Sequence, residues 1–313
     1  MAPSSTTNLV DGKPAAPALE RTNGETAVGG AEAVVEALAQ PAATKPSTLP
    51  TFSLQDRVVA ITGGASGLGL VMGKGVVDSG AHLAIVDINK KAAELEVDVL
   101  RMAYKEQYPE RTPPRITAHY ADVADPASIA ACVADIVAAH GKIDHLVTSA
   151  GFTENFASTE YPVDRMRKLW AVNVDGTYLF AVEVARHLME RKSPGSMVFI
   201  GSMSGAIVNV PQLQTPYNAS KAAVKHLASS LAVEWADAGI RVNCISPGYM
   251  STALTEKILA ERPDLKEKWV GGTPMKRMGL PQDLMGPVTF LLSDAASYVT
   301  GTELRVDGGY TVV

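Results

Sequence analysis

The chain has 313 residues, a mass of 33.0 kDa and a hydrophobic content of 46%, enough apolar material for one large α/β domain or two small ones. Its 28 Lys and Arg residues against 33 Asp and Glu residues give a net charge of -5, so nucleic-acid binding is not expected. No apolar run reaches the roughly 18 residues that span a bilayer, and the six histidines form no HExxH motif, so neither a membrane protein nor a metal site is predicted. Cys132 and Cys244 form no CxxC pair, which favours a reducing compartment and a cytoplasmic protein.

Residues 1–50 differ in composition from the rest of the chain. They are rich in Ala, Pro, Thr, Gly and Ser, and the first aromatic residue is Phe52. Such a segment buries too little apolar surface to offset the entropy of ordering, so we predict a disordered tail with a short helical pattern at 31–39. Its five acidic residues argue against a mitochondrial targeting peptide, and it lacks the basic start and apolar core of a secretory signal. The alternative interpretation is a regulatory or docking segment.

From residue 51 onward, short β-branched runs alternate with segments of helical period. The predicted strands are 58–61, 82–86, 116–120, 145–148, 197–200, 241–245 and 303–306. Helices are predicted at 68–79, 126–140, 164–191 and 216–238, and a surface loop at 104–115. The alternation predicts one α/β domain over 51–313, with a Rossmann-like, doubly wound parallel sheet of about seven strands and helices on both faces.

The first predicted strand leads into a glycine-rich turn, TGGASGLG at 62–69. Glycines let the backbone approach a pyrophosphate closely, and the free N–H groups at the start of the following helix favour its charge. Taken alone, such a glycine-rich segment fits an ordinary tight turn as well as it fits a dinucleotide site. Its place after the first strand of the domain favours a dinucleotide site.

Acidic residues follow the second and third predicted strands. Asp87, followed by Ile88, stands where a carboxylate accepts hydrogen bonds from the adenosine ribose hydroxyls and repels a 2′-phosphate, so NAD is favoured. The alternative for Asp87 is a helix cap or an ordinary loop residue, and Lys90 and Lys91 leave NADP open. Asp122 would accept from the adenine amino group or cap the next helix.

A tyrosine and a lysine four residues apart form the strongest catalytic pattern. Tyr217 and Lys221 share one face if the segment is helical. A nearby ammonium stabilises a phenolate, which lowers the tyrosine pKa from about 10 and makes the group a usable acid or base. Ser202 follows the strand 197–200, where its hydroxyl would point into the crevice at the strand ends. Asn173, taken singly, is more often a structural hydrogen-bonding residue than a catalyst.

Taken in order, these motifs resemble those of the short-chain dehydrogenase/reductase family over roughly residues 52–313. The motifs are TGGASGLG at 62–69, Asp122-Val123, Ser149-Ala150-Gly151, Asn173, Ser202, YNASK at 217–221, Pro247-Gly248 with Thr252, and Asp307-Gly308-Gly309. The resemblance implies an NAD(P)-dependent enzyme that interconverts a secondary alcohol and a ketone by hydride transfer. It also implies a homo-oligomer, a tetramer or a dimer, assembled through the helical segments 164–191 and 216–238.

The resemblance further implies roles for individual residues. Tyr217 would be the general acid in reduction and the general base in oxidation. Lys221 would lower its pKa and hold the nicotinamide ribose, Ser202 would hydrogen-bond the carbonyl oxygen, and Asn173 would keep a water in a proton relay. The residues implied to bind the cofactor are Gly63, Ser66, Gly67, Leu68, Gly69, Asp87, Ile88, Asp122, Val123, Ser149, Ala150, Gly151, Tyr217, Lys221, Pro247, Gly248 and Thr252.

Two departures from the family pattern bear on the site. The family usually has Asn-Asn-Ala-Gly after the fourth strand, where this chain has Thr148-Ser149-Ala150-Gly151, and we expect binding to be retained. The spacing to Tyr217 fits Ser204 better than Ser202, whereas the strand end fits Ser202. We choose Ser202 and assign the extra length to the loop 207–216.

At a finer level, the segments 202–205, 234–236, 246–249 and 291–309 resemble sugar-alcohol dehydrogenases and ketose reductases of the mannitol, arabinitol, sorbose and xylulose types. Polar residues expected near the pocket mouth suit a hydroxylated substrate: Glu154, Asn155, Asn209, Gln212 and Gln214. We therefore predict a polyol or ketose substrate.

The alternative substrate is a more apolar ketone or alcohol of secondary metabolism. Met250, Leu254 and Trp269 could line such a pocket, within a substrate-covering segment at 249–278. A lesser alternative is a non-catalytic dinucleotide-binding protein, which would be expected to lose the Tyr or the Lys.

Overall fold

The computed structural model describes residues 48–313, and its backbone follows the predicted alternation of strands and helices. The predicted tail, with its helical pattern at 31–39, lies outside the described residues except for its last three positions. Among the helices of the described region, none combines the length and the apolar character needed to cross a membrane.

Seven strands form a single parallel sheet. They are β1 (Val58–Thr62), β2 (His82–Asp87), β3 (Ile116–Tyr120), β4 (His145–Thr148), β5 (Gly195–Ile200), β6 (Ile240–Pro247) and β7 (Glu303–Val306). Their order is β3-β2-β1-β4-β5-β6-β7, and every neighbouring pair is parallel. The strand order reverses between β1 and β4, which opens a crevice at their carboxyl ends. The predicted Rossmann-like sheet is confirmed.

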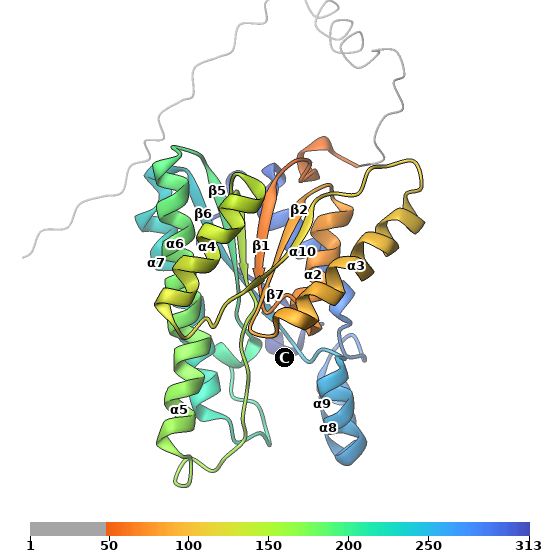
Figure 1. Cartoon of the computed structure of the whole chain (residues 1–313). Helices are drawn as coiled ribbons and strands as arrows, with labels where there is room; N and C mark the ends of the chain where they lie inside the picture. Colours follow the sequence, from red (N-terminus) through yellow and green to blue (C-terminus); the bar gives the residue numbers. More distant parts are fainter. Residues whose placement is uncertain (1–47) are drawn as a thin grey trace, which may run out of the picture. The chain divides into compact units, whose positions relative to one another are not determined.

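Helices cover both faces of this sheet (Figure 1). One face carries α2 (Gly67–Asp78), α3 (Lys90–Gln107) and α10 (Met285–Leu292), and the other carries α4 (Pro126–His140), α6 (Gly176–Glu190) and α7 (Thr215–Glu234). Two hydrophobic clusters result, with Met72 and Val288 in one and Phe180 and Phe199 in the other. Strands β1, β4 and β5 are buried at every position, as their apolar sequences predict.

The predicted helix at 164–191 is not continuous. It consists of α5 (Val163–Trp170) and α6, separated by the π-helical turn η2 (Ala171–Asp175) that carries Asn173. A π turn inserts an extra residue into the helix and changes the direction in which the following side chains point. The periodicity of the sequence did not reveal this interruption.

Two other predicted boundaries also shift. The predicted loop 104–115 begins too early, because α3 continues to Gln107 and Tyr104 is buried against Tyr108, with ring centroids 4.9 Å apart. The predicted helix 216–238 ends as an α-helix at Glu234 and finishes in a 3-10 turn, η4 (Ala236–Ala238).

The predicted substrate-covering segment 249–278 forms two helices, α8 (Ala253–Glu261) and α9 (Pro263–Gly272). Leu259, Leu265 and Trp269 form a small hydrophobic cluster of their own there, separate from the two clusters that flank the sheet. Helices α8 and α9 project beyond the same end of the sheet as α5 (Figure 1). Few core contacts therefore restrain this segment, which suits an element that covers a site.

His145 opens β4 and is enclosed by the sheet. Its Nδ1 accepts a hydrogen bond from the backbone N–H of Ser196 at 3.1 Å, and its side chain is buried. Burial lowers the pKa of His145 to about 3, so the folded chain holds the imidazole neutral.

We predict that replacing His145 makes the free energy of unfolding depend less steeply on pH in the acid range. The unfolded chain takes up a proton at His145 near pH 6.5, whereas the folded chain does so only near pH 3, so stability is full above pH 6.5 and falls toward pH 3. Between pH 6 and 4 this group contributes a slope of about 1.4 kcal/mol per pH unit. Urea unfolding of wild type and His145→Gln, whose amide oxygen can still accept from Ser196, should show the smaller slope in the variant. Equal slopes would contradict the assignment.

Candidate active site

A cavity of about 1210 Å³ opens at the carboxyl ends of the strands. Nearly all the predicted site residues line it: Gly63, Ser66, Gly67, Leu68, Gly69, Asp87, Ile88, Asp122, Val123, Ser149, Ala150, Gly151, Ser202, Tyr217, Lys221, Pro247, Gly248 and Thr252. Asn173 is the exception, because it is fully buried behind the wall.

The glycine-rich turn is packed so tightly that its glycines have no room for side chains. Gly63 has a φ of +63°, and a β carbon there would lie 2.8 Å from the Cα of Ala150. A β carbon on Gly69 would lie 2.2 Å from the carbonyl oxygen of Gly63. A side chain at either position would separate β1 from the end of β4 or from the first turn of α2.

Gly67 in the same turn faces open space. Its φ is +55°, and a β carbon there would meet nothing within 4 Å. Within the described residues, no side chain caps the N-terminus of α2 at Ser66, so its first N–H groups are left for a ligand. A tight glycine turn with uncapped N–H groups at a cavity wall fits the pyrophosphate of a dinucleotide.

Thr62 at the end of β1 holds the turn after β4. Its Oγ1 accepts from the backbone N–H groups of Ser149 and Ala150, both at 3.2 Å. The turn is therefore positioned through its backbone, which explains how Ser149 can stand where the family usually has Asn.

Asp87 ends β2 beside the glycine-rich turn. Its carboxylate accepts from the backbone N–H of Ala65 at 3.2 Å and from that of Asn89 at 2.9 Å. The cap of α3 is Asn89, whose Oδ1 accepts from the N–H of Ala92, so Asp87 is not a helix cap, and its two backbone bonds hold the loop at the end of β2. A carboxylate has about four acceptor positions, and two backbone bonds leave capacity for ribose hydroxyls.

Asp122 lies in the turn after β3. Its Oδ1 accepts from the N–H of Ala124 at 2.9 Å, and its own N–H donates to Ser128 Oγ at 3.0 Å. The cap of α4 is Asp125. The capping alternative for Asp122 is therefore wrong, and its carboxylate shapes the cavity wall.

Tyr217, Lys221 and Ser202 come together where β5 and α7 meet the cavity. The Nζ of Lys221 donates to the carbonyl of Ile200 at 2.8 Å and lies 5.7 Å from the ring centroid of Tyr217. The hydroxyl of Ser202 is close enough to Tyr217 to act on its pKa, and it accepts from the N–H of Ser204 at 3.1 Å. A hydroxyl, a phenol and an amine therefore share one corner of the cavity.

The electrostatics of this corner are set mainly by loss of water. Desolvation raises the pKa of Tyr217, and the neighbouring Ser202 hydroxyl acts in the opposite direction. Burial lowers the pKa of Lys221 to about 8. The net shift of the Tyr217 pKa is upward, whereas the sequence predicted a lowering by Lys221, whose amine donates to the carbonyl of Ile200. In the chain by itself, Tyr217 is a neutral phenol that can donate a proton.

Asn173 joins the turn after β4 to α7. Its Oδ1 accepts from the N–H of Phe152 at 3.1 Å, and its Nδ2 donates to the carbonyl of Phe152 at 3.0 Å and to Ser220 Oγ at 3.2 Å. A β carbon on Gly151 would lie 3.1 Å from Asn173 Oδ1 and 3.6 Å from Lys221 Nζ. The π turn therefore places this amide next to the buried amine.

Ser204 does not face Tyr217. Its buried hydroxyl donates to Asn209 Oδ1 at 2.5 Å and accepts from Gln214 Nε2 at 3.3 Å. The hydroxyl of Ser204 is therefore bound to the loop 207–216, and Ser202 is the serine that acts on the tyrosine.

The predicted substrate-facing residues divide into those that line the cavity and those that do not. Asn155, Asn209, Gln212, Gln214, Met250 and Trp269 line it. Glu154 does not, because Arg165 forms an ion pair with it and the hydroxyl of Tyr161 donates to it at 3.2 Å. The side chain of Leu254 lies outside the described residues.

A family profile described as enoyl-(acyl carrier protein) reductase matches residues 63–311. The chain belongs to the short-chain dehydrogenase/reductase family. The family resemblance seen in the motifs is confirmed, and with it the class of NAD(P)-dependent alcohol dehydrogenases and carbonyl reductases.

The matches to relatives in this short-chain dehydrogenase/reductase family extend over almost the whole length of those proteins. The D-arabinitol 2-dehydrogenase (ribulose-forming) of Candida tropicalis is 39% identical over 267 residues, which cover 84% of this chain and 95% of that protein. The NADH-dependent L-xylulose reductase of Ambrosiozyma monospora is 38% identical, over 84% of this chain and 98% of its own. A solved gluconate 5-dehydrogenase from Burkholderia cenocepacia J2315, in complex with NADP and tartrate, has a TM-score of 0.75 at 31% identity, covering 84% and 98% of the two chains.

Tyr249 also lines the cavity of this short-chain dehydrogenase/reductase, although the sequence analysis did not include it among the polar residues expected near the pocket. Its hydroxyl accepts from Asn209 Nδ2 and Gln212 Nε2, both at 3.1 Å. The signal available in the sequence was its position directly after Pro247-Gly248, at the end of a strand.

We predict that Asn173→Leu destabilises the protein by about 2–5 kcal/mol, because it keeps the branched shape of the side chain but leaves the N–H and C=O of Phe152 without partners. Thr177→Val is the matched control, since it removes one buried hydroxyl that donates to the Asn173 carbonyl, and should cost about 1 kcal/mol or less. Urea unfolding measures both. A loss below about 1 kcal/mol in the leucine variant would show that the bridge contributes little.

Proposed function

We propose that this chain interconverts a polyol and a ketose with NAD(P). The observation that carries the proposal is one cavity with two chemically distinct walls. Ser202, Tyr217 and Lys221 stand on one wall, and the amide side chains of Asn209 and Gln212 stand on another. Amides suit substrate hydroxyls, and the named relatives act on arabinitol and xylulose.

A bound nicotinamide supplies the hydride in reduction and accepts it in oxidation. In reduction, the ketone carbon gains the hydride while the C=O π electrons move to oxygen. Ser202 donates a hydrogen bond to that oxygen, and Tyr217 transfers its phenolic proton to it and is left as phenolate. Oxidation runs these transfers in reverse, with the Tyr217 phenolate taking the hydroxyl proton.

Lys221 favours the phenolate form of Tyr217 as long as its amine is protonated. With a pKa of about 8, the amine is a cation at neutral pH despite its burial. Asn173 fixes the turn after β4 beside this amine. In the proposed relay, protons would pass from Lys221 toward solvent through a water held by Asn173.

Tyr217→Phe should lower kcat by about 10²–10⁴-fold, because it removes the proton that the alkoxide oxygen needs. The affinity for NADH, measured by fluorescence titration, should stay within about twofold, since the ring and Lys221 remain. Tyr298→Phe, the same change at a fully exposed position before β7, is the control and should match wild type in the NAD(P)H absorbance assay. Wild-type turnover by Tyr217→Phe would refute the proposed acid.

We infer that NAD is preferred over NADP. The carboxylate of Asp87 lines the cavity at the end of β2, and Ile88 follows it where a phosphate-binding cation would be needed. A negative charge there repels a 2′-phosphate. The name of the L-xylulose reductase supports the same choice, whereas the gluconate 5-dehydrogenase structure contains NADP.

Asp87→Asn should lower the ratio of kcat/KM with NAD to kcat/KM with NADP by about tenfold, because it removes the charge and keeps an acceptor for the backbone. Asp122→Asn removes another cavity carboxylate at the end of β3 and should change both cofactors alike. Initial rates with each cofactor decide the matter, and an unchanged ratio in the Asp87 variant would overturn the inference.

We also propose a homo-oligomer that assembles through α6 and α7. Tyr178 and Met189 on α6 and Val233 on α7 are exposed apolar residues, at 42%, 40% and 81% of their surface. Light scattering coupled to size-exclusion chromatography would report a dimer or a tetramer.

The cytoplasm is the proposed compartment, supported by Cys132 and Cys244, which are both free and buried.

A further inference from the structure

The hydroxyl of Tyr249 lies where three separate segments of the chain meet. Tyr249 follows β6, its two amide partners lie in the loop 207–216, and its ring contacts α9. The residue lines the cavity together with Ser202 and Tyr217. It is therefore placed to touch whatever the catalytic corner acts on.

The ring of Tyr249 is held on two sides. It stacks on Trp269 with centroids 4.2 Å apart and an interplanar angle of 8°. Tyr310 packs edge-on against it, with centroids 5.2 Å apart at 89°. Such contacts fix the position of a phenol without using its hydroxyl.

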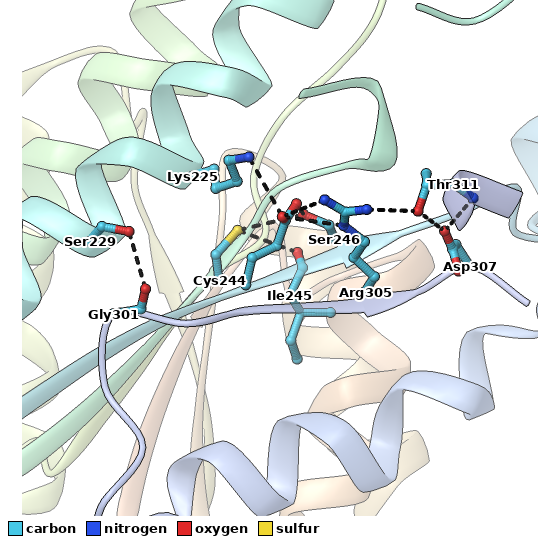
Figure 2. A network of polar contacts seen from close by, with 10 residues as sticks. Lys225, Ser229, Cys244, Ile245, Ser246, Gly301, Arg305, Asp307 and Thr311 are labelled. Atoms are coloured by element: carbon cyan, nitrogen blue, oxygen red, sulfur yellow. Dashed lines mark hydrogen bonds and ion pairs between the residues drawn. The ribbon is translucent and has the colours of Figure 1, made fainter. Parts of the chain in front are cut away.

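Tyr310 is itself fixed by the polar network of the last strand and the turn after it (Figure 2). Asp307 accepts from the N–H of Gly309 at 2.9 Å. It also accepts from the N–H and the hydroxyl of Thr311 at 3.0 and 2.7 Å. Arg305 donates to the same threonine hydroxyl at 3.1 Å. The turn that carries Tyr310 therefore has a defined shape, and with it the aromatic wall around Tyr249.

The hydrogen bonds of Tyr249 leave its proton without a strong acceptor. Asn209 and Gln212 both donate to its oxygen, which occupies the acceptor sites. Two groups stand near the phenolic hydrogen: Gln212 Oε1 at 3.5 Å, the limit of hydrogen-bond distance, and the hydroxyl of Tyr310. Burial raises the pKa of Tyr249 to about 12, so the group stays a neutral donor.

We propose that Tyr249 is a substrate-binding residue that donates a hydrogen bond to a substrate hydroxyl remote from the reacting carbon. Asn209 and Gln212 orient this donor by filling its acceptor sites. The assignment rests on the proposed polyol–ketose function and names the group that selects a polyhydroxylated substrate.

A neutral hydroxyl suits this position better than a carboxylate. The neighbours of Tyr249 in the cavity wall include Met250, Leu265 and Trp269, which offer no charge. Arg262 also lines the cavity, but its Nε and Nη2 are both bound to Asp264 at 2.8 Å. A substrate carboxylate would have to compete with that ion pair.

The test compares two five-carbon ketones with the carbonyl on the second carbon, ribulose and 2-pentanone, of which only ribulose has further hydroxyls. Tyr249→Phe keeps the stacked ring and should lower kcat/KM for ribulose by about tenfold, mainly through KM, and leave 2-pentanone within about twofold. The Kd of D-arabinitol for the enzyme–NADH complex, measured by calorimetry, should rise by about tenfold, with the Kd of NADH unchanged.

Two further variants sharpen the comparison. Tyr298→Phe makes the same change at a fully exposed position outside the cavity lining and should leave both ketones and the arabinitol Kd as in wild type. Gln212→Leu removes one orienting donor and should shift the ribulose to 2-pentanone ratio in the same direction as Tyr249→Phe, by a smaller factor.

The outcomes separate this assignment from the proposed function. Equal losses on both ketones in Tyr249→Phe, or an unchanged arabinitol Kd, would overturn the role of Tyr249 alone. A wild-type enzyme that reduces 2-pentanone but neither ribulose nor other ketoses would overturn the polyol–ketose function, and the assignment of Tyr249 with it.

Discussion

The turn after β4 is held from both sides, and the rest of the site depends on it. On one side the hydroxyl of Thr62 accepts from the N–H groups of Ser149 and Ala150, so the turn is joined to β1 and its glycine loop. On the other side Asn173 binds the backbone of Phe152 and also reaches Ser220 on α7. The glycine-rich turn and the catalytic helix α7 are thereby both positioned by the same four-residue segment, 149–152. A shift in that segment would move both ends of the hydride-transfer geometry together.

Burial has opposite consequences for the two catalytic groups. The cavity corner disfavours charge, so the pKa of Tyr217 rises and that of Lys221 falls. A neutral phenol is the form needed to protonate an alkoxide, so the corner is already arranged for reduction. For oxidation the phenolate must form, and the nearby ammonium and the Ser202 hydroxyl are the features of this chain that favour it. The low polarity that raises the cost of charge also strengthens these interactions once charge develops.

Sequence reasoning was most successful where the pattern is a property of the backbone. The seven strands were predicted nearly to the residue, and the central strands β1, β4 and β5 show why, because a parallel strand covered on both faces is a short apolar run. The glycine turn, the tyrosine–lysine pair and the end of β2 follow from that register, and the structure places them around one cavity. The π turn at Asn173 was not predictable, because one inserted residue hardly changes the periodicity of apolar residues. Glu154 was misjudged because its ion pair with Arg165, eleven residues later, depends on tertiary structure.

The two walls of the cavity are built in different ways, and this difference suggests how the enzyme separates chemistry from selectivity. Ser202, Tyr217 and Lys221 lie on β5 and α7 or at their ends, where the sheet fixes their mutual geometry. The other wall combines a loop, α9 and the C-terminal turn, which meet at Tyr249 through side-chain contacts. Side-chain contacts between loops can change without disturbing the sheet. Substitutions on that wall can therefore alter which hydroxyls are recognised, while the hydride and proton transfers stay fixed by the fold.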